Sequence, residues 1–128
     1  MSLRVILIAA GIVAILFGLF LLFGAEAAIQ QYNLGDSTLP ARLFGRATGA
    51  LLVSLGIINI LASGDSGSPA LRAVVIGNIV VHAFSLGADF SESYARNAGV
   101  WISLIIHVAF IVTFGWALLN WSKMTKTA

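Results

Sequence analysis

Four long apolar stretches alternate along the chain with short polar segments. They run from about residue 4 to 25, 41 to 63, 69 to 90 and 98 to 121, and their few charged residues lie in first or last turns. A helix needs roughly 20 mostly apolar residues to cross a bilayer, and a segment in lipid must be helical because no water satisfies its backbone groups. The pattern therefore predicts an all-α integral membrane protein, an antiparallel four-helix bundle forming one domain over residues 1–128.

The helix boundaries have local signals of their own. Ser68 followed by Pro69 is typical of an N-cap with proline in the first turn, and Thr38 and Pro40 open the second span in a similar way. The loop between the first two spans is the longest and most polar. Residues 25–32, at its start, could form a short helix at the membrane surface.

The first span has an alternative interpretation as a signal peptide, with Ala25-Glu26-Ala27 as the cleavage site. Its apolar run is too long for a signal-peptide core of about 7–15 residues, and only Arg4 supplies an amino-terminal charge. A retained membrane span is therefore the favoured interpretation.

Orientation follows from the basic residues that flank the spans, because cytoplasmic loops carry an excess of Lys and Arg. One side holds Arg4, Arg72, Lys123 and Lys126, and the other holds Arg42, Arg46 and Arg96. This narrow excess predicts that both termini are cytoplasmic, in what we expect to be a bacterial inner membrane.

The composition agrees with lipid as the solvent. Hydrophobic residues make up 59% of the chain and charged residues 9%, whereas soluble domains carry about 25% charged residues. The net charge of +2 is too small to indicate a nucleic-acid partner. The absence of cysteine excludes disulfides, thiolate metal sites and iron–sulfur clusters.

Polar residues inside the spans are the most informative feature, because lipid makes them costly. On the third span Asn78, His82, Ser85 and Asp89 follow at spacings of four, three and four, which places them on one helix face. By the same counting a second-span face holds Arg42, Arg46, Gly49, Gly56, Asn59 and Ser63, and Ser103 and His107 share a fourth-span face.

The first span has no polar residue in its interior and carries only the small residues Gly11, Gly18 and Gly24. We therefore expect the second, third and fourth spans to line a polar interior. The first is expected to pack through its small residues and to expose the rest to lipid.

The depths of the polar residues form layers. At about 1.5 Å per residue, His82 and His107 lie roughly 12 and 13.5 Å below the same surface. Arg46 and Asp89 fall in a layer above them, and Asn59 and Asn78 fall in a layer below. Arg46 either pairs with Asp89 across the bundle or anchors the helix by reaching the headgroups.

These residues form a candidate ligand site, comprising His82, His107, Asn78, Ser85, Asp89, Arg46, Asn59 and Ser103. Two imidazoles can relay protons, hold a small ligand or ligate haem. The alternative is that they only join helices, at about 0.6 kcal/mol for an average hydrogen bond between membrane helices. Structural zinc takes four ligands, so no metal is expected, and no cofactor is expected either.

The remaining motifs do not indicate catalysis. Gly45 and Gly49 form a G-x-x-x-G motif, which lets membrane helices approach closely. The sequence has no nucleophile elbow, no H-E-x-x-H and no phosphate-binding loop. The protein is therefore expected not to be an enzyme.

The layout resembles small four-helix bacterial membrane proteins of the DoxX-like and related uncharacterised families. The residues that carry the resemblance are Leu22-Phe23-Gly24, the run Pro40-Ala41-Arg42-Leu43-Phe44-Gly45-Arg46, Gly77-Asn78 to His82, and Trp101 to His107. The resemblance covers most of the chain and implies a fold but no reaction.

Three functions remain open at this point. The first is an accessory or scaffold subunit that packs against a larger membrane partner or its own copies. The second is a carrier or binding protein whose polar intramembrane site holds an ion, a proton or a small lipophilic ligand. The third is a redox component that holds haem or quinone.

Overall fold

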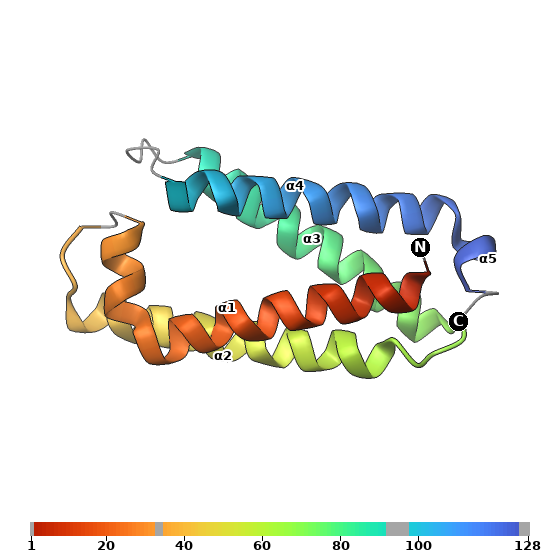
Figure 1. Cartoon of the computed structure of the whole chain (residues 1–128), viewed down its shortest axis with the longest axis horizontal. Coiled ribbons are helices and arrows are strands. Elements are labelled where there is room, and N and C mark those ends of the chain that lie inside the picture. The colour runs from red at the N-terminus through yellow and green to blue at the C-terminus, as the bar shows by residue number, and fades with distance from the viewer. Residues whose placement is uncertain (1, 33–34, 92–97, 126–128) are drawn as a thin grey trace.

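The computed structural model describes residues 2–32, 35–91 and 98–125, and its regular elements there are helices. They are α1 (Leu3–Gln31), α2 (Leu39–Ala62), α3 (Pro69–Ser91), α4 (Ala98–Leu119) and the short α5 (Trp121–Met124), as Figure 1 shows. The first four are long and apolar enough to cross a bilayer. The predicted all-α four-helix arrangement is therefore confirmed, and the chain is an integral membrane protein.

Two helices end differently from the prediction. The segment predicted as a separate surface helix is continuous with α1, which bends where Gly24 leaves helical geometry (φ −116°, ψ 30°). Beyond the bend, α1 turns towards the side of the molecule that α4 occupies (Figure 1). The fourth span stops at Leu119 rather than at Trp121, because Asn120 is not helical (φ −110°, ψ 26°) and Trp121 begins α5.

The predicted helix starts are confirmed. The Thr38 hydroxyl accepts the Ala41 N–H at 3.3 Å, and the Ser68 hydroxyl accepts the Leu71 N–H at 3.1 Å. Each bond satisfies one of the backbone donors that a helix leaves unpaired in its first turn. Helices α2 and α3 therefore both begin at a capped residue.

Helices α1 and α2 form a close hairpin through glycines that face one another. A Cβ atom on Gly18 would lie 2.7 Å from the carbonyl oxygen of Gly49, and one on Gly11 would lie 2.8 Å from that of Gly56. Only hydrogen fits at these positions, so the two backbones touch, as small residues allow in membrane helix pairs. Gly45, the other member of the predicted motif, has a looser contact with Ala25, at 3.3 Å.

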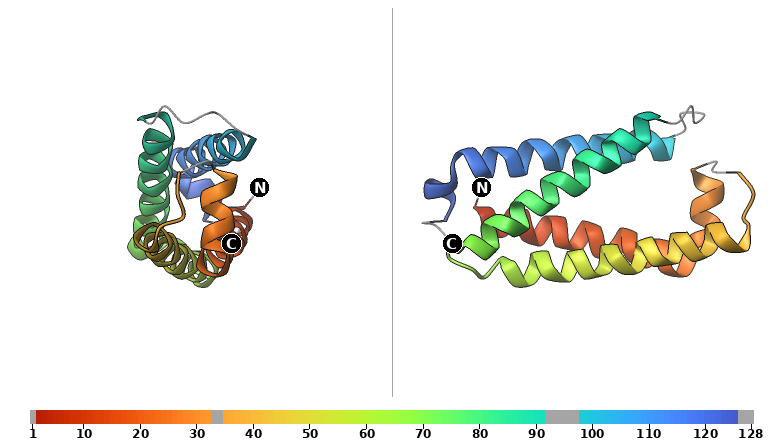
Figure 2. Two further views of the ribbon diagram at one scale, coloured as in Figure 1. Left: turned by 90° about the vertical axis from the view of Figure 1, so that its left-hand side faces the viewer. Right: turned by 180° about the vertical axis from the view of Figure 1, so that it is seen from behind.

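The hydrophobic core lies at the end of the bundle where α1 begins and α5 lies. Its buried members are Leu3, Ile6, Leu7, Ala10, Leu71, Val75, Phe114, Ala117 and Met124. The α1–α2 and α3–α4 hairpins meet there and diverge towards the opposite end (Figures 1 and 2). The prediction that α1 packs only through its small residues is wrong in its first turns, where large aliphatic side chains fill the core.

Candidate functional site

His82 on α3 and His107 on α4 are in direct contact. Their Nδ1 atoms lie 2.9 Å apart, and their ring planes cross at 48° with centroids 5.2 Å apart. The depth arithmetic placed the two residues at one level, and this prediction is confirmed. What the arithmetic left open was the rotation of each helix, which turns the two rings towards each other.

A hydrogen bond between two Nδ1 atoms fixes how protons are shared. One Nδ1 must carry the proton and the other must offer its lone pair. In a neutral imidazole the proton that is missing from one nitrogen is on the other. The ring that donates through Nδ1 therefore has a bare Nε2, and the ring that accepts has a protonated Nε2.

Aromatic neighbours fix the orientation of the His82 ring. The ring stacks on Phe110 of α4, with planes 13° apart and centroids 4.9 Å apart, and lies 6.5 Å from the ring of Phe114. Phe114 belongs to the hydrophobic core and is fully buried. The imidazole therefore packs against the hydrophobic core at one end of the bundle.

Asn59 on α2 and Asn78 on α3 lie one layer below the histidines, as predicted. Each side-chain amide donates to the other, at 2.9 and 2.7 Å, and Asn78 also donates to the Val74 carbonyl at 2.9 Å. Both residues are buried, with exposed fractions of 0% and 1%. The two side-chain amides hydrogen-bond each other and thereby join the two hairpins.

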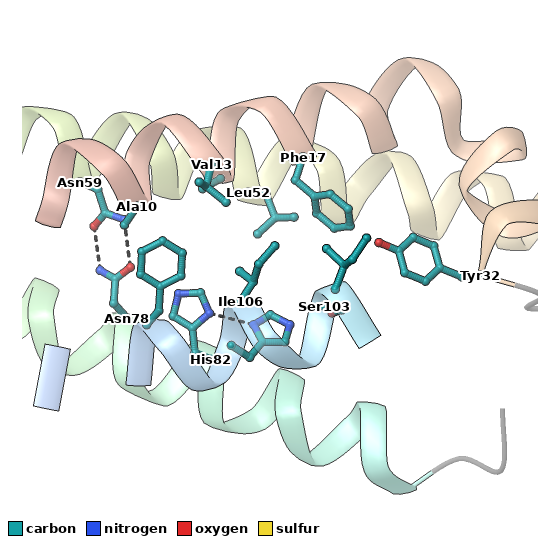
Figure 3. Close-up of a pocket in the computed structure, with 14 residues that line it drawn as sticks. Ala10, Val13, Phe17, Tyr32, Leu52, Asn59, Asn78, His82, Ser103 and Ile106 are labelled. Atoms are coloured by element: carbon teal, nitrogen blue, oxygen red, sulfur yellow. Dashed lines mark hydrogen bonds between the residues drawn. The ribbon is translucent and has the colours of Figure 1, made fainter. Parts of the chain in front are cut away.

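A cavity of about 140 Å³ lies between the hairpins beside these polar residues (Figure 3). Asn59, Asn78, His82, Ser103 and His107 contribute to its wall. The rest of the wall is apolar or aromatic and comprises Ala10, Val13, Ala14, Phe17, Tyr32, Leu52, Ile102, Ile106 and Phe110. The expectation that α2, α3 and α4 alone line the interior is therefore wrong, because α1 forms one whole side of the cavity.

The other predicted site residues are Ser85, Arg46 and Asp89. Ser85 is half-buried and is not part of the cavity wall. Arg46 is exposed, and the side chain of Asp89 lies outside the described residues, so their pairing stays a prediction. Arg42 donates a hydrogen bond to the Ser37 carbonyl in the preceding loop.

Sequence reasoning missed two aromatic residues that close the cavity. Phe17 faces it from the middle of α1, and the Phe17 and Tyr32 rings meet edge to face with centroids 6.3 Å apart. Tyr32 lies just beyond the carboxy-terminal end of α1. The bend at Gly24 brings it over the cavity, and hydropathy carries no signal for such a bend.

The geometry of the described residues does not fit the haem alternative. No group of three or more His, Cys, Asp or Glu side chains comes together in the described part of the chain. The histidines bond to each other directly at 2.9 Å, and the cavity has the size of a single ring, far smaller than a porphyrin. The arrangement thus leaves no room for bis-imidazole haem ligation.

Comparisons with protein-family models, with curated proteins and with solved structures find no match to this chain.

Proposed function

We propose that this protein binds a small lipophilic molecule, with one hydrogen-bonding group, inside the membrane. The observation that carries the proposal is the cavity of about 140 Å³ whose apolar wall is interrupted by the bonded histidines. An engineered protein cavity of about 150 Å³ binds benzene. A cavity of this size beside imidazoles therefore suits a single ring with a polar substituent.

The polar groups at the site favour binding over a purely structural role. Asn59 and Asn78 already join the hairpins and satisfy each other. The histidine pair lies within the α3–α4 hairpin, one layer further into the divergent part of the bundle, and borders open space. Polar groups that only join helices have no need of an adjoining cavity.

The role of accessory subunit, whether beside a larger partner or its own copies, stays a prediction. Large apolar side chains face outwards on all four long helices, including Leu16, Leu51, Phe84 and Val112. Lipid alone requires such a surface, so it does not distinguish a protein partner from the bilayer. A redox role with quinone also stays a prediction, as does the expectation that the protein is not an enzyme.

Location and orientation complete the proposal. The start of α1 and the short α5 lie at the same end of the bundle (Figure 1), which supports placing both ends of the chain on one side of the membrane. The basic residues favour the cytoplasm for that side. We place the protein in a bacterial inner membrane, in keeping with its resemblance to small DoxX-like membrane proteins.

Binding can be tested with the full chain in lipid nanodiscs and radiolabelled 4-hexylphenol, corrected for uptake by empty nanodiscs. We expect saturable binding to one site, which Ala14→Phe abolishes because the new ring fills the cavity. Val112→Phe, on the outward face of α4 with an exposed fraction of 64%, is the matched control and should bind normally. Binding that is not saturable, or that Ala14→Phe leaves intact, would rule the proposal out.

A further inference from the structure

We infer that the ligand is an uncharged ring alcohol or phenol with an alkyl tail, whose hydroxyl group bonds Nε2 of His82 and whose tail lies in the bilayer. This inference rests on the proposed function and specifies its ligand class. It depends on three features of the site: an accessible ring nitrogen, a cavity wall without charged side chains, and an opening from the cavity to the lipid.

The accessible ring nitrogen is Nε2 of His82. The hydrogen bond to His107 uses only Nδ1, and the remaining contacts of the His82 ring are with the rings of Phe110 and Phe114. In the described part of the chain no buried side-chain nitrogen or oxygen lacks a hydrogen-bond partner. Nε2 of His82 therefore reaches open space, and the residue lines the cavity.

A hydroxyl group suits this nitrogen in either of its forms. Nε2 of an imidazole is either bare, and accepts a hydrogen bond, or protonated, and donates one. A hydroxyl group donates to the first form and accepts from the second, whereas a carbonyl or ether oxygen can only accept. The match with a hydroxyl group therefore does not depend on which of the two histidines holds the shared proton, nor on what else His107 bonds.

The cavity wall indicates that the head of the ligand is uncharged. Among the described residues, no Asp, Glu, Lys or Arg side chain lines the cavity. The amides of Asn59 and Asn78 are already bonded to each other. A carboxylate or an ammonium head would lose its hydration there without gaining a counter-ion, which is costly inside a bilayer. A hydroxyl group avoids this cost.

The opening to the lipid gives the tail its route. Val13 and Phe17 of α1 and Ile102 of α4 line the cavity and yet have exposed fractions of 37%, 37% and 56%. The cavity wall is therefore continuous with the outer surface between α1 and α4, and that surface faces lipid. An alkyl tail can pass between these side chains into the bilayer while the ring stays beside His82.

The binding test compares three probes with the same tail on the full chain in nanodiscs at neutral pH. They are 4-hexylphenol, hexylbenzene and the cationic 4-hexylbenzylamine, with affinities expressed relative to each probe's concentration in the lipid. We expect the phenol to bind about fivefold more tightly than hexylbenzene, as one net hydrogen bond provides, and the cation to bind more weakly than hexylbenzene. A cation that binds as tightly as the phenol would overturn the uncharged class.

The length of the tail tests the route into the bilayer. The tail is in lipid both before and after binding, so 4-dodecylphenol should bind as tightly as 4-hexylphenol when both affinities are expressed relative to the lipid. A cavity of about 140 Å³ that closed around the ligand would have no room for the longer tail. Loss of binding with 4-dodecylphenol would therefore overturn the opening between α1 and α4.

Two variants separate this inference from the proposed function. Asparagine at position 82 places an amide where Nδ1 lies and nothing where Nε2 lies, so His82→Asn should bind 4-hexylphenol and hexylbenzene equally. Ala14→Phe should bind neither. If Ala14→Phe abolishes binding while the wild type binds the two probes equally, the ligand class is wrong and the proposed function stands. If Ala14→Phe binds both like the wild type, the proposed function fails.

A spectroscopic test locates the hydroxyl group directly. The chain has two histidines, so the ¹⁵N-histidine NMR signals that disappear in His82→Asn belong to His82. We expect 4-hexylphenol to shift the Nε2 signal of His82 in the wild type and hexylbenzene to leave this signal nearly unchanged. Saturable binding of the phenol without a shift of the Nε2 signal would overturn the assignment of this atom.

Discussion

The side-chain amides of Asn59 and Asn78 exchange two hydrogen bonds, of 2.9 and 2.7 Å, between α2 and α3. The pair is fully buried and lies one helical turn from His82 along α3. It joins the two hairpins next to the hydrophobic core, at the point from which they diverge. The amide pair therefore sets the closed end of the cavity, and the histidines lie just beyond it.

The Asn59–Asn78 bond should make the two residues strongly interdependent. Either Asn59→Leu or Asn78→Leu leaves the other amide buried without its partner, at a cost of about 1–3 kcal/mol. The double variant leaves no orphaned amide at this pair, so it should be less destabilised than the sum of the single changes. Unfolding in mixed micelles titrated with SDS measures all three, and simple additivity would show that the amides do not interact.

Gly49→Ala should separate α1 from α2. The added Cβ would lie 2.6 Å from the Gly18 carbonyl oxygen and 2.7 Å from the Leu22 backbone nitrogen, and backbone atoms cannot move aside as a flexible side chain can. We expect a loss of about 1–3 kcal/mol in the same unfolding assay.

The matched control for this glycine is Gly77→Ala on α3, where an added Cβ meets nothing within 4 Å. Alanine is favoured over glycine in a helix interior by up to about 1 kcal/mol. The control should therefore be neutral or slightly stabilising, and an equal loss in both variants would show that the loss does not come from the contact between Gly49 and α1.

His82 and His107 should act as one unit. If the pair forms the binding site, His82→Ala and His107→Ala should each weaken 4-hexylphenol binding at least fivefold, and the double variant should be no worse than either. If the residues only join helices, each change should cost about 1 kcal/mol or less of stability and should leave binding unchanged. Val108→Ala, beside His107 but 47% exposed, is the control.

The loop between α2 and α3 should make stability depend on acid pH. The Asp65 carboxylate accepts bonds from the Ser68 hydroxyl at 2.6 Å and from the Ser68 and Gly67 N–H groups at 2.9 Å. The side-chain bond from Ser68, followed by these backbone bonds, lowers the pKa of Asp65 below its ordinary value. The charged form is thus favoured in the folded state.

For a carboxylate with a lowered folded-state pKa, the stabilisation is fully present above the unfolded value of about 3.9 and is lost as the pH falls through the folded value. Wild type should therefore melt at a higher temperature than Asp65→Asn at pH 7, and the difference should shrink at about pH 3. Ser66→Ala, in the same loop, should melt in parallel with wild type. A difference that is independent of pH would contradict this account.

Orientation can be measured with reporter fusions. The proposal places both ends of the chain in the cytoplasm, so fusions of alkaline phosphatase after residue 125 should be inactive and fusions of a fluorescent protein should be bright. Fusions after residue 36, in the loop between α1 and α2, should show the reverse pattern. A periplasmic signal from the carboxy-terminal fusion would invert the proposed topology.

The sequence alone determined the number and approximate limits of the spans, because the thickness of the hydrocarbon core sets the length of an apolar helix. It also determined the two capped helix starts, since Ser68 and Thr38 satisfy donors in their own first turns. The common level of His82 and His107 followed from the rise per residue of two helices joined by a short connection.

The tertiary structure decided how each helix is rotated and bent. Apolar side chains are equally stable facing lipid or facing a neighbouring helix, so hydropathy does not show which face of a membrane helix is inside. Backbone contact at Gly18 and Gly49 orients α1, and the bend at Gly24 brings Tyr32 over the cavity. Close packing between helices, which only the folded chain possesses, therefore created the cavity and turned the histidines towards each other.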